Sequence, residues 1–154
     1  MEPFFKDYLS HMQRLRDDAL RDLESLPQDA MDWVPAPEMN SFCALVVHMT
    51  SAERYWIGDV AGGKSRGRTR EEEFQAHGLK KETLMELVRR TYDETCGILQ
   101  KLTLEDLAKT RTAHVINREV TVGWALAKAL MHTGLHVGHI QIQRQWWEQH
   151  QQGK

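Results

Sequence analysis

Three histidines in the C-terminal third of the chain have a spacing that could bind a metal ion. They are His132, His136 and His139, and Gln143 continues the series, at steps of four, three and four residues. On an α-helix, residues three and four positions apart lie on one face, so these side chains would form a single stripe. Two imidazoles at i and i+4 can reach a common point, which is the usual way for one helix to supply two nitrogen ligands. The pair His132 and His136 is therefore the first candidate for a metal centre.

A third ligand must come from another part of the chain, and the candidate is His48 in the apolar segment L-V-V-H-M-T-S-A-E-R-Y-W. Each histidine alone could be an ordinary core residue. Burying three neutral imidazoles without partners would, however, cost several kcal/mol, and a metal would satisfy them. Three neutral nitrogens favour zinc or nickel over magnesium or calcium. Three protein ligands also leave a coordination position free, as in catalytic rather than structural sites.

Three further side chains are candidates for a substrate contact or for support of the ligands. His139 shares the helix face with the pair and could close the site as a fourth ligand. Arg144 lies eight residues beyond His136 and could meet a substrate carboxylate, or it could be a surface or dimer-interface residue. Glu53 could orient a ligand or pair with a neighbouring helix. The chain contains neither H-E-x-x-H nor E-x-x-H, which argues against a metalloprotease and against a di-iron bundle. The catalytic residues themselves stay unknown.

Four amphipathic helices must position these residues. The first begins at Pro3 and ends near Pro27, and the second begins with Asn40 or Ser41 as N-cap and reaches about Gly58. The third covers roughly residues 80–102. The last has Thr121 as N-cap and extends through residues 124–147, with Leu126, Leu130, Leu135 and Ile142 as its recurring apolar residues. Residues 108–119 are polar and predict an irregular segment, and no convincing strand pattern is present. The sequence thus predicts an all-α four-helix bundle with long connections.

Composition is typical of one folded domain, residues 1–154, with 41% hydrophobic and 27% charged residues. The net charge of −2 and the absence of nucleic-acid-binding motifs argue against a nucleic-acid partner. The basic cluster at residues 64–70 is interpreted as a solvated loop. Two unpaired cysteines, no signal-like N-terminus and no long apolar run predict a cytoplasmic protein without a membrane segment.

Three motifs together resemble the DinB/YfiT-like superfamily of small metal-binding bundles. They are W-V-P-A-P-x-x-N-S at residues 33–41, H-M-T-S-A-E-R-Y-W at residues 48–56 and H-T-G-L-H-V-G-H-I-Q at residues 132–141. The resemblance covers nearly the whole chain in the right order and spacing. It implies an up-down-down-up helix order, a homodimer, and one divalent ion, often zinc or nickel, bound by His48, His132 and His136. His139 falls where many members have glutamine.

Characterised branches of that superfamily include S-transferases that use low-molecular-weight thiols and a mycothiol-dependent isomerase. The resemblance therefore implies a metal-dependent transferase, in which the ion lowers the pKa of a bound thiol, or of water, for attack on a small electrophile. A non-catalytic, dimeric metal-binding protein with a stress or regulatory role is the alternative. The two hypotheses differ in whether the metal keeps an open position. A third possibility is a bundle with no metal, in which the histidines are packing residues.

Overall fold

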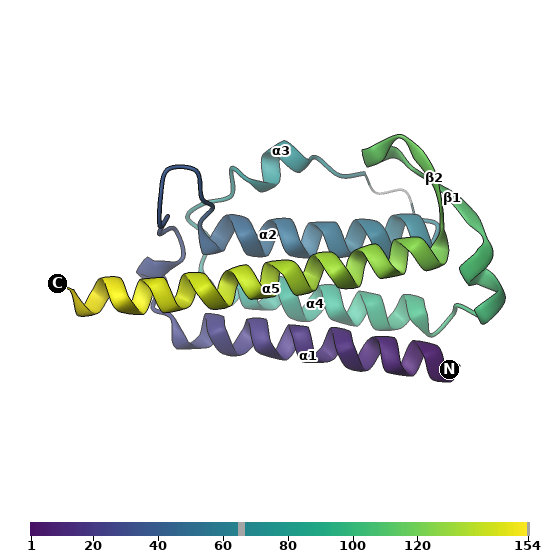
Figure 1. Ribbon diagram of the computed structural model, residues 1–154, viewed down its shortest axis with the longest axis horizontal. Coiled ribbons are helices and arrows are strands. Elements are labelled where there is room, and N and C mark those ends of the chain that lie inside the picture. The colour runs from purple at the N-terminus through teal and green to yellow at the C-terminus, as the bar shows by residue number, and fades with distance from the viewer. Residues whose placement is uncertain (65–66, 154) are drawn as a thin grey trace.

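The computed structural model describes residues 1–64 and 67–153 and contains four long helices that pack side by side. They are α1 (Pro3–Ser25), α2 (Phe42–Glu53), α4 (Lys81–Leu99) and α5 (Val122–Gln152). In Figure 1, α1 and α5 run toward one end of the bundle, while α2 and α4 run toward the other. The predicted four-helix bundle and its up-down-down-up order are therefore confirmed.

The helix starts follow local capping chemistry. Pro3 occupies the first turn of α1, where its missing N–H leaves no bond unmade. Ser41 caps α2, since its Oγ accepts a hydrogen bond from the Ala44 N–H at 3.1 Å, and Thr121 caps α5 by accepting from the Trp124 N–H at 3.1 Å. Each cap satisfies a backbone donor that would otherwise have no partner in the first turn.

The second helix continues after Glu53 as a π-helical segment, η2 (Arg54–Ala61), and so extends slightly beyond the predicted end at Gly58. It ends at Gly62, where a Cβ atom would lie only 2.8 Å from the Gly58 carbonyl oxygen. That close approach to backbone requires a glycine at this position. The chain then passes through the short helix α3 (Arg70–Glu73), which lies above α2 in Figure 1.

A small antiparallel hairpin, β1 (Thr110–Ala113) and β2 (Arg118–Thr121), joins α4 to α5. The prediction of an irregular segment at residues 108–119 is wrong here, because β1 and the start of β2 fall within it. The strands have four residues each, and each buries only one of them, so neither shows a clear alternating pattern. Between the strands, the Val115 N–H donates to the Tyr55 hydroxyl at 3.1 Å, which ties the hairpin to the end of η2.

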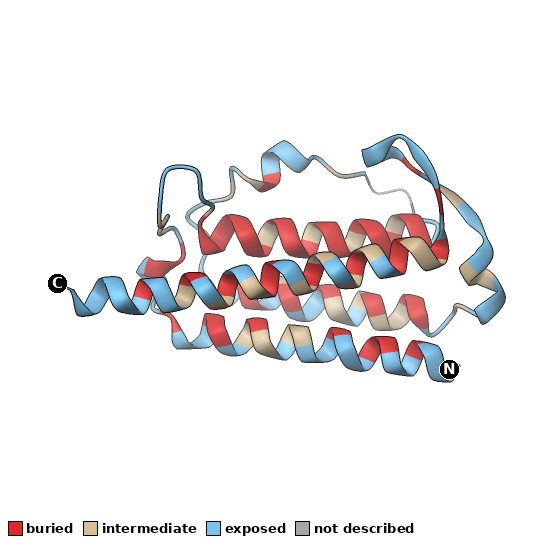
Figure 2. Ribbon diagram, in the orientation of Figure 1, coloured by how far each residue is buried: buried red, intermediate tan, exposed pale blue. Residues whose placement is uncertain are grey.

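The core fills the space between the four helices. In Figure 2, buried residues recur along each helix and make up most of α2. The α5 pattern differs from the predicted one. Leu126 is buried, but Leu135 and Ile142 are about half exposed. Apolar residues therefore lie on two sides of α5, and their spacing in the sequence did not distinguish the buried ones from the exposed ones. Among the described residues, no helix is long and apolar enough to cross a membrane.

Candidate metal centre

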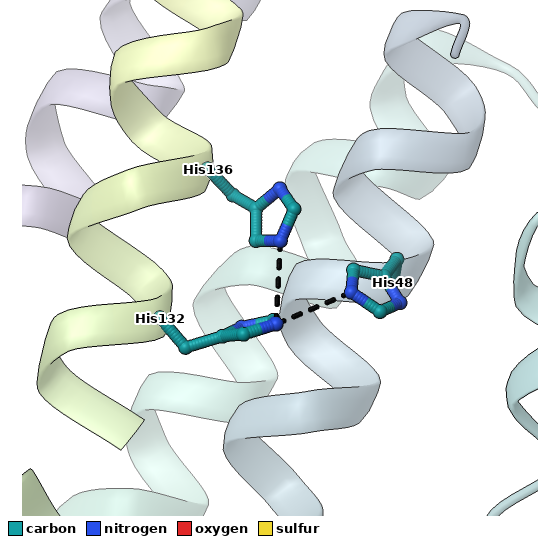
Figure 3. Close-up of side chains that lie close together, drawn as sticks. All are labelled: His48, His132 and His136. Atoms are coloured by element: carbon teal, nitrogen blue, oxygen red, sulfur yellow. Dashed lines mark hydrogen bonds between the residues drawn. The ribbon is translucent and has the colours of Figure 1, made fainter. Parts of the chain in front are cut away.

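His48 on α2 meets His132 and His136 on α5, and these three residues form a compact cluster, the histidine triad (Figure 3). The Nε2 atom of His132 lies 3.2 Å from Nε2 of His48 and 3.3 Å from Nε2 of His136. The three ligand atoms lie within 4.8 Å of one another. Because α2 and α5 pack directly together, residues 84 positions apart in the sequence share one site.

The nitrogen spacing fits a single small cation. In tetrahedral zinc sites with Zn–N bonds of about 2.0–2.1 Å, neighbouring ligand nitrogens lie about 3.3–3.4 Å apart. Two of the three separations in the triad, 3.2 and 3.3 Å, match this value, and the third is no more than 4.8 Å. Within residues 1–64 and 67–153, no fourth His, Cys, Asp or Glu joins the group. Three nitrogen donors at this spacing could bind one divalent ion and would leave a coordination position of that ion free.

The tautomer of His48 is fixed by a carboxylate that sequence analysis missed. The Nδ1 atom of His48 lies 2.8 Å from Oε2 of Glu73, at the end of α3. A carboxylate can only accept, so the ring proton resides on Nδ1 and donates to Glu73. Nε2 is then left with a bare lone pair that faces His132. This carboxylate–histidine arrangement is the one that orients metal ligands and raises their basicity.

Glu73 is itself held by two donors. Arg68 makes a bidentate pair with it, Nε to Oε1 at 2.6 Å and Nη2 to Oε2 at 2.7 Å, and the Ser51 hydroxyl donates to Oε1 at 2.5 Å. The side chains of Arg68 and Glu73 are only 4% and 6% exposed. Burial tends to raise the pKa of Glu73, but the bonds from Arg68 and Ser51 outweigh it and hold that pKa below its usual value. Glu73 is therefore a charged acceptor at neutral pH.

The loop before α3 differs from its predicted character. Arg68 belongs to the basic cluster interpreted as a solvated loop, yet its side chain is buried against Glu73. Residues 65 and 66 of that cluster lie outside the described residues. Phe74, just after α3, stacks on the His48 ring at 4.4 Å between centroids. The segment after residue 66 thus covers one side of His48.

The three histidines of the triad are uncharged near neutral pH. Burial lowers the pKa of His132 to about 4, with a further lowering from His48, and lowers that of His136 to about 3, with His132 adding to the effect. The pKa of His48 is also lowered, first by burial, although the bond to Glu73 acts in the opposite direction. Neutral imidazoles are the form that binds metals. The Nδ1 atoms of His132 and His136 are buried without a hydrogen-bond partner among the described residues.

The structure places His139 beside the triad but not in it. His139 is exposed, and its ring centroid lies 5.3 Å from that of His136. Gln143, the last member of the predicted stripe, is buried and donates to the Trp33 carbonyl at 3.2 Å. The i, i+4 pair and His48 are therefore the members of the predicted set that the fold brings together.

Glu53 and Arg144 lie in other environments. Glu53 is buried and its Oε1 accepts from the Thr95 hydroxyl at 2.7 Å. Arg144 Nε lies 3.0 Å from Oδ1 of Asp22 on α1, and Arg144 also pairs with Glu148 one turn along α5. The carboxylate that contacts His48 is Glu73, not Glu53.

With the fold and the histidine triad described, comparisons define the class of protein. The family model of the DinB superfamily matches residues 11–140, so the chain belongs to the DinB superfamily. That membership confirms the resemblance seen in the sequence. No protein with a curated function matches this chain significantly.

Solved structures share the fold at low sequence identity. YfiT from Bacillus subtilis, described as a probable metal-dependent hydrolase with an unusual four-helix bundle topology, superposes with a TM-score of 0.77 at 12% identity, over 94% of this chain and 89% of YfiT. A DinB-like protein from Bacillus subtilis gives a TM-score of 0.70 at 22% identity, over 90% of both chains. A mycothiol-dependent maleylpyruvate isomerase gives 0.67 at 12% identity, over 89% of this chain and 62% of that protein. At these identities the similarity shows the fold.

Proposed function

We propose that this DinB-superfamily protein is a metal-dependent transferase that uses a low-molecular-weight thiol. The observation that carries the proposal is the convergence of three neutral Nε2 atoms, with no fourth protein ligand among the described residues. His48, His132 and His136 would hold one divalent ion, zinc or nickel by the chemistry of the donor set. Such an ion supplies Lewis acidity, which lowers the pKa of a thiol or water at its free position.

The protein side chains supply orientation and exclude water. Glu73 holds the His48 proton on Nδ1, so that Nε2 keeps its lone pair toward the site. Phe74 covers the His48 ring, and α2 and α5 enclose the triad from the core side. The low pKa values of His132 and His136 keep their rings uncharged near neutral pH, with one ring nitrogen of each free to bind an ion. These residues hold the ligand atoms in place before any substrate arrives.

A cavity of about 560 Å³ has the size expected for a small substrate. Its lining includes the basic residues Lys64 and Arg111 and the acidic Asp59, together with Tyr55 and His114. Tyr55 lies seven residues after His48, which is about 10 Å along a helix. The basic side chains suit a thiol or electrophile that carries a carboxylate.

Water is the second candidate for the activated group. The description of YfiT as a probable metal-dependent hydrolase, at a TM-score of 0.77, supports it. Both candidates need the same ion and the same free position. A cytoplasmic location, where low-molecular-weight thiols are reduced, agrees with the unpaired Cys43 and Cys96.

The test is an activity comparison on protein loaded with zinc or with nickel. Consumption of small thiols, including mycothiol, bacillithiol and glutathione, is followed with chlorodinitrobenzene as electrophile, and hydrolysis is followed with nitrophenyl acetate. We expect thiol transfer that is lost in His136→Ala and after chelation. Hydrolysis alone would replace the transferase proposal with a hydrolase. Metal binding without either activity would favour the non-catalytic alternative.

A further inference from the structure

A cavity of about 450 Å³ lies between α2, α3 and α4, and we call it the α2–α4 cavity. Arg68 borders both this cavity and the cavity of about 560 Å³ described above. Among the described residues, no histidine of the triad lines the α2–α4 cavity. Charged and hydroxyl side chains make up most of its wall, and Val47 and Leu87 contribute apolar surface. Such a lining suits a small polar molecule that has a carbon skeleton.

The charged residues of the wall are three arginines and three glutamates. Arg68 and Glu73 bind each other through two hydrogen bonds, and Glu94 already has an interaction partner. Three charged side chains of the wall have no hydrogen bond or ion pair with any described residue: Arg54, Arg90 and Glu72. The unpaired charges around the α2–α4 cavity are therefore two cations and one anion.

The two unpaired arginines come from different helical segments. Arg54 belongs to η2 and is only partly exposed, and Arg90 belongs to α4. An unpaired arginine on a surface is common, but two guanidinium groups around one cavity repel each other unless an anion lies between them. The planar guanidinium group matches a carboxylate through two parallel hydrogen bonds. Arg54 and Arg90 are therefore suited to bind a carboxylate in this cavity.

The uncharged part of the wall favours an organic anion. Thr91 is only 8% exposed, and its hydroxyl makes no hydrogen bond with any described residue. A buried hydroxyl without a partner costs free energy, and an anion in the cavity would accept a hydrogen bond from it. Val47 and Leu87 can contact a carbon skeleton, whereas phosphate has none, and Glu72 opposes the second negative charge of phosphate.

We propose that the α2–α4 cavity is an effector site for a small organic carboxylate, coupled to the histidine triad through Glu73. Arg54 and Arg90 bind the carboxylate, Thr91 donates a hydrogen bond to it, and the apolar part of the wall contacts the rest of the molecule. This site is separate from the proposed transfer reaction, whose reactants meet at the metal ion. Carboxylate binding needs no metal, whereas the coupling rests on the metal binding proposed above.

Ser51 and Glu73 connect the cavity to the triad. Both residues line the α2–α4 cavity, and the Ser51 hydroxyl donates to Glu73 Oε1 at 2.5 Å. The other oxygen of Glu73, Oε2, accepts from His48 Nδ1 at 2.8 Å. A residue of the cavity wall therefore contacts a ligand of the candidate metal centre. An anion in the cavity adds negative charge near the triad and favours a cation there, and by linkage the cation favours the anion equally.

The first test is isothermal titration calorimetry of the metal-free protein with succinate and with inorganic phosphate, in buffer without chloride. We expect saturable succinate binding that is tighter than phosphate binding. Arg54→Gln and Arg90→Gln should each raise the dissociation constant of succinate at least about 10-fold, because each removes charge-assisted hydrogen bonds to the carboxylate. Arg89→Gln, at the exposed neighbour on α4 outside the cavity wall, is the matched control and should bind succinate like wild type.

Unchanged circular dichroism establishes that the variants are folded. Absence of saturable succinate binding to wild type would overturn the proposal, and so would binding that survives both arginine substitutions. An equal loss of binding in Arg89→Gln would also overturn it, since any surface cation would then have the same effect. Tighter binding of phosphate than of succinate would contradict the assignment to an organic carboxylate.

The second test compares the dissociation constants of succinate for zinc-loaded and for metal-free protein. We expect zinc to tighten succinate binding by about 3- to 10-fold in wild type. The zinc effect should disappear in Arg54→Gln/Arg90→Gln, because succinate that bound the zinc ion directly would still respond to zinc in that variant. Equal succinate affinity with and without zinc, or a zinc effect that survives the double substitution, would overturn the coupling. A protein that binds succinate but no zinc would refute the coupling and the proposed function together, and would leave the carboxylate site in place.

Discussion

Glu73→Gln should weaken metal binding although Glu73 is not a ligand. The substitution keeps the size of the side chain but removes the charge that accepts the His48 Nδ1 proton at 2.8 Å. Loss of such an outer carboxylate lowers metal affinity by about 10- to 100-fold, or roughly 1.4–2.7 kcal/mol. The same substitution leaves the buried Arg68 guanidinium without its partner, which destabilises the fold by about 3–5 kcal/mol. Both affinity and stability should therefore fall.

A second variant separates the two effects. In Arg68→Met/Glu73→Gln, the unpaired buried charge is absent, so stability should return to within about 1–2 kcal/mol of wild type. Metal affinity should stay low, because the amide is still a weaker acceptor for His48 than the carboxylate. Glu72→Gln, at the exposed neighbour on the same helical turn, is the matched control and should change neither property.

The assay is a zinc titration in competition with a chromophoric chelator, together with urea unfolding of the metal-free proteins. The reasoning is refuted if the folded double variant binds zinc as tightly as wild type, since Glu73 would then have no part in orienting His48. An equal loss of zinc affinity in Glu72→Gln would show that any loss of negative charge near the site weakens binding, whether or not the carboxylate contacts His48.

Three further predictions concern buried titratable side chains and one buried ion pair. The pKa values of the three triad histidines are lowered in the folded state. The metal-free protein should therefore lose stability as the pH falls below about 6.5, where unfolded histidine binds protons. Urea unfolding between pH 7.5 and 5 measures this loss, and a variant with glutamine at all three triad positions should show a weaker dependence of stability on pH. Burial raises the pKa of Glu53 to about 7, so its contribution falls as the pH rises from about 4.5 through 7, and Glu53→Gln should be more stable relative to wild type at pH 8 than at pH 5; equal differences at both pH values would count against a buried neutral carboxyl. Arg144→Gln should leave zinc content unchanged but lower the melting temperature, because it leaves Asp22 buried without its cation, and loss of zinc would instead place Arg144 in the metal site.

The helices and the pair His132 and His136 could be predicted from the sequence because both depend on local periodicity. An i, i+4 pair points to one side of a helix whatever the rest of the fold does. His48 was found because a histidine within an apolar helix needs a partner in the core. The N-caps Ser41 and Thr121 were found from side-chain chemistry alone.

The supporting residues could not be predicted because they depend on the path of a loop. Glu73 ends a run of three glutamates, and only the fold shows that it, rather than Glu71 or Glu72, turns inward to His48. Arg68 looked like one of several loop cations until its carboxylate partner was placed beside it. Similarly, Leu135 and Ile142 have the spacing of a helix face, but spacing does not say whether that face meets the core.

Elemental analysis of untagged wild-type protein and of His136→Ala, purified side by side, shows directly whether the histidine triad binds an ion. We expect near-stoichiometric zinc or nickel in wild type and almost none in the folded variant, because two nitrogens cannot replace three. Absence of metal from both proteins, even after incubation with the ions, would contradict the account and leave the triad as a packing cluster.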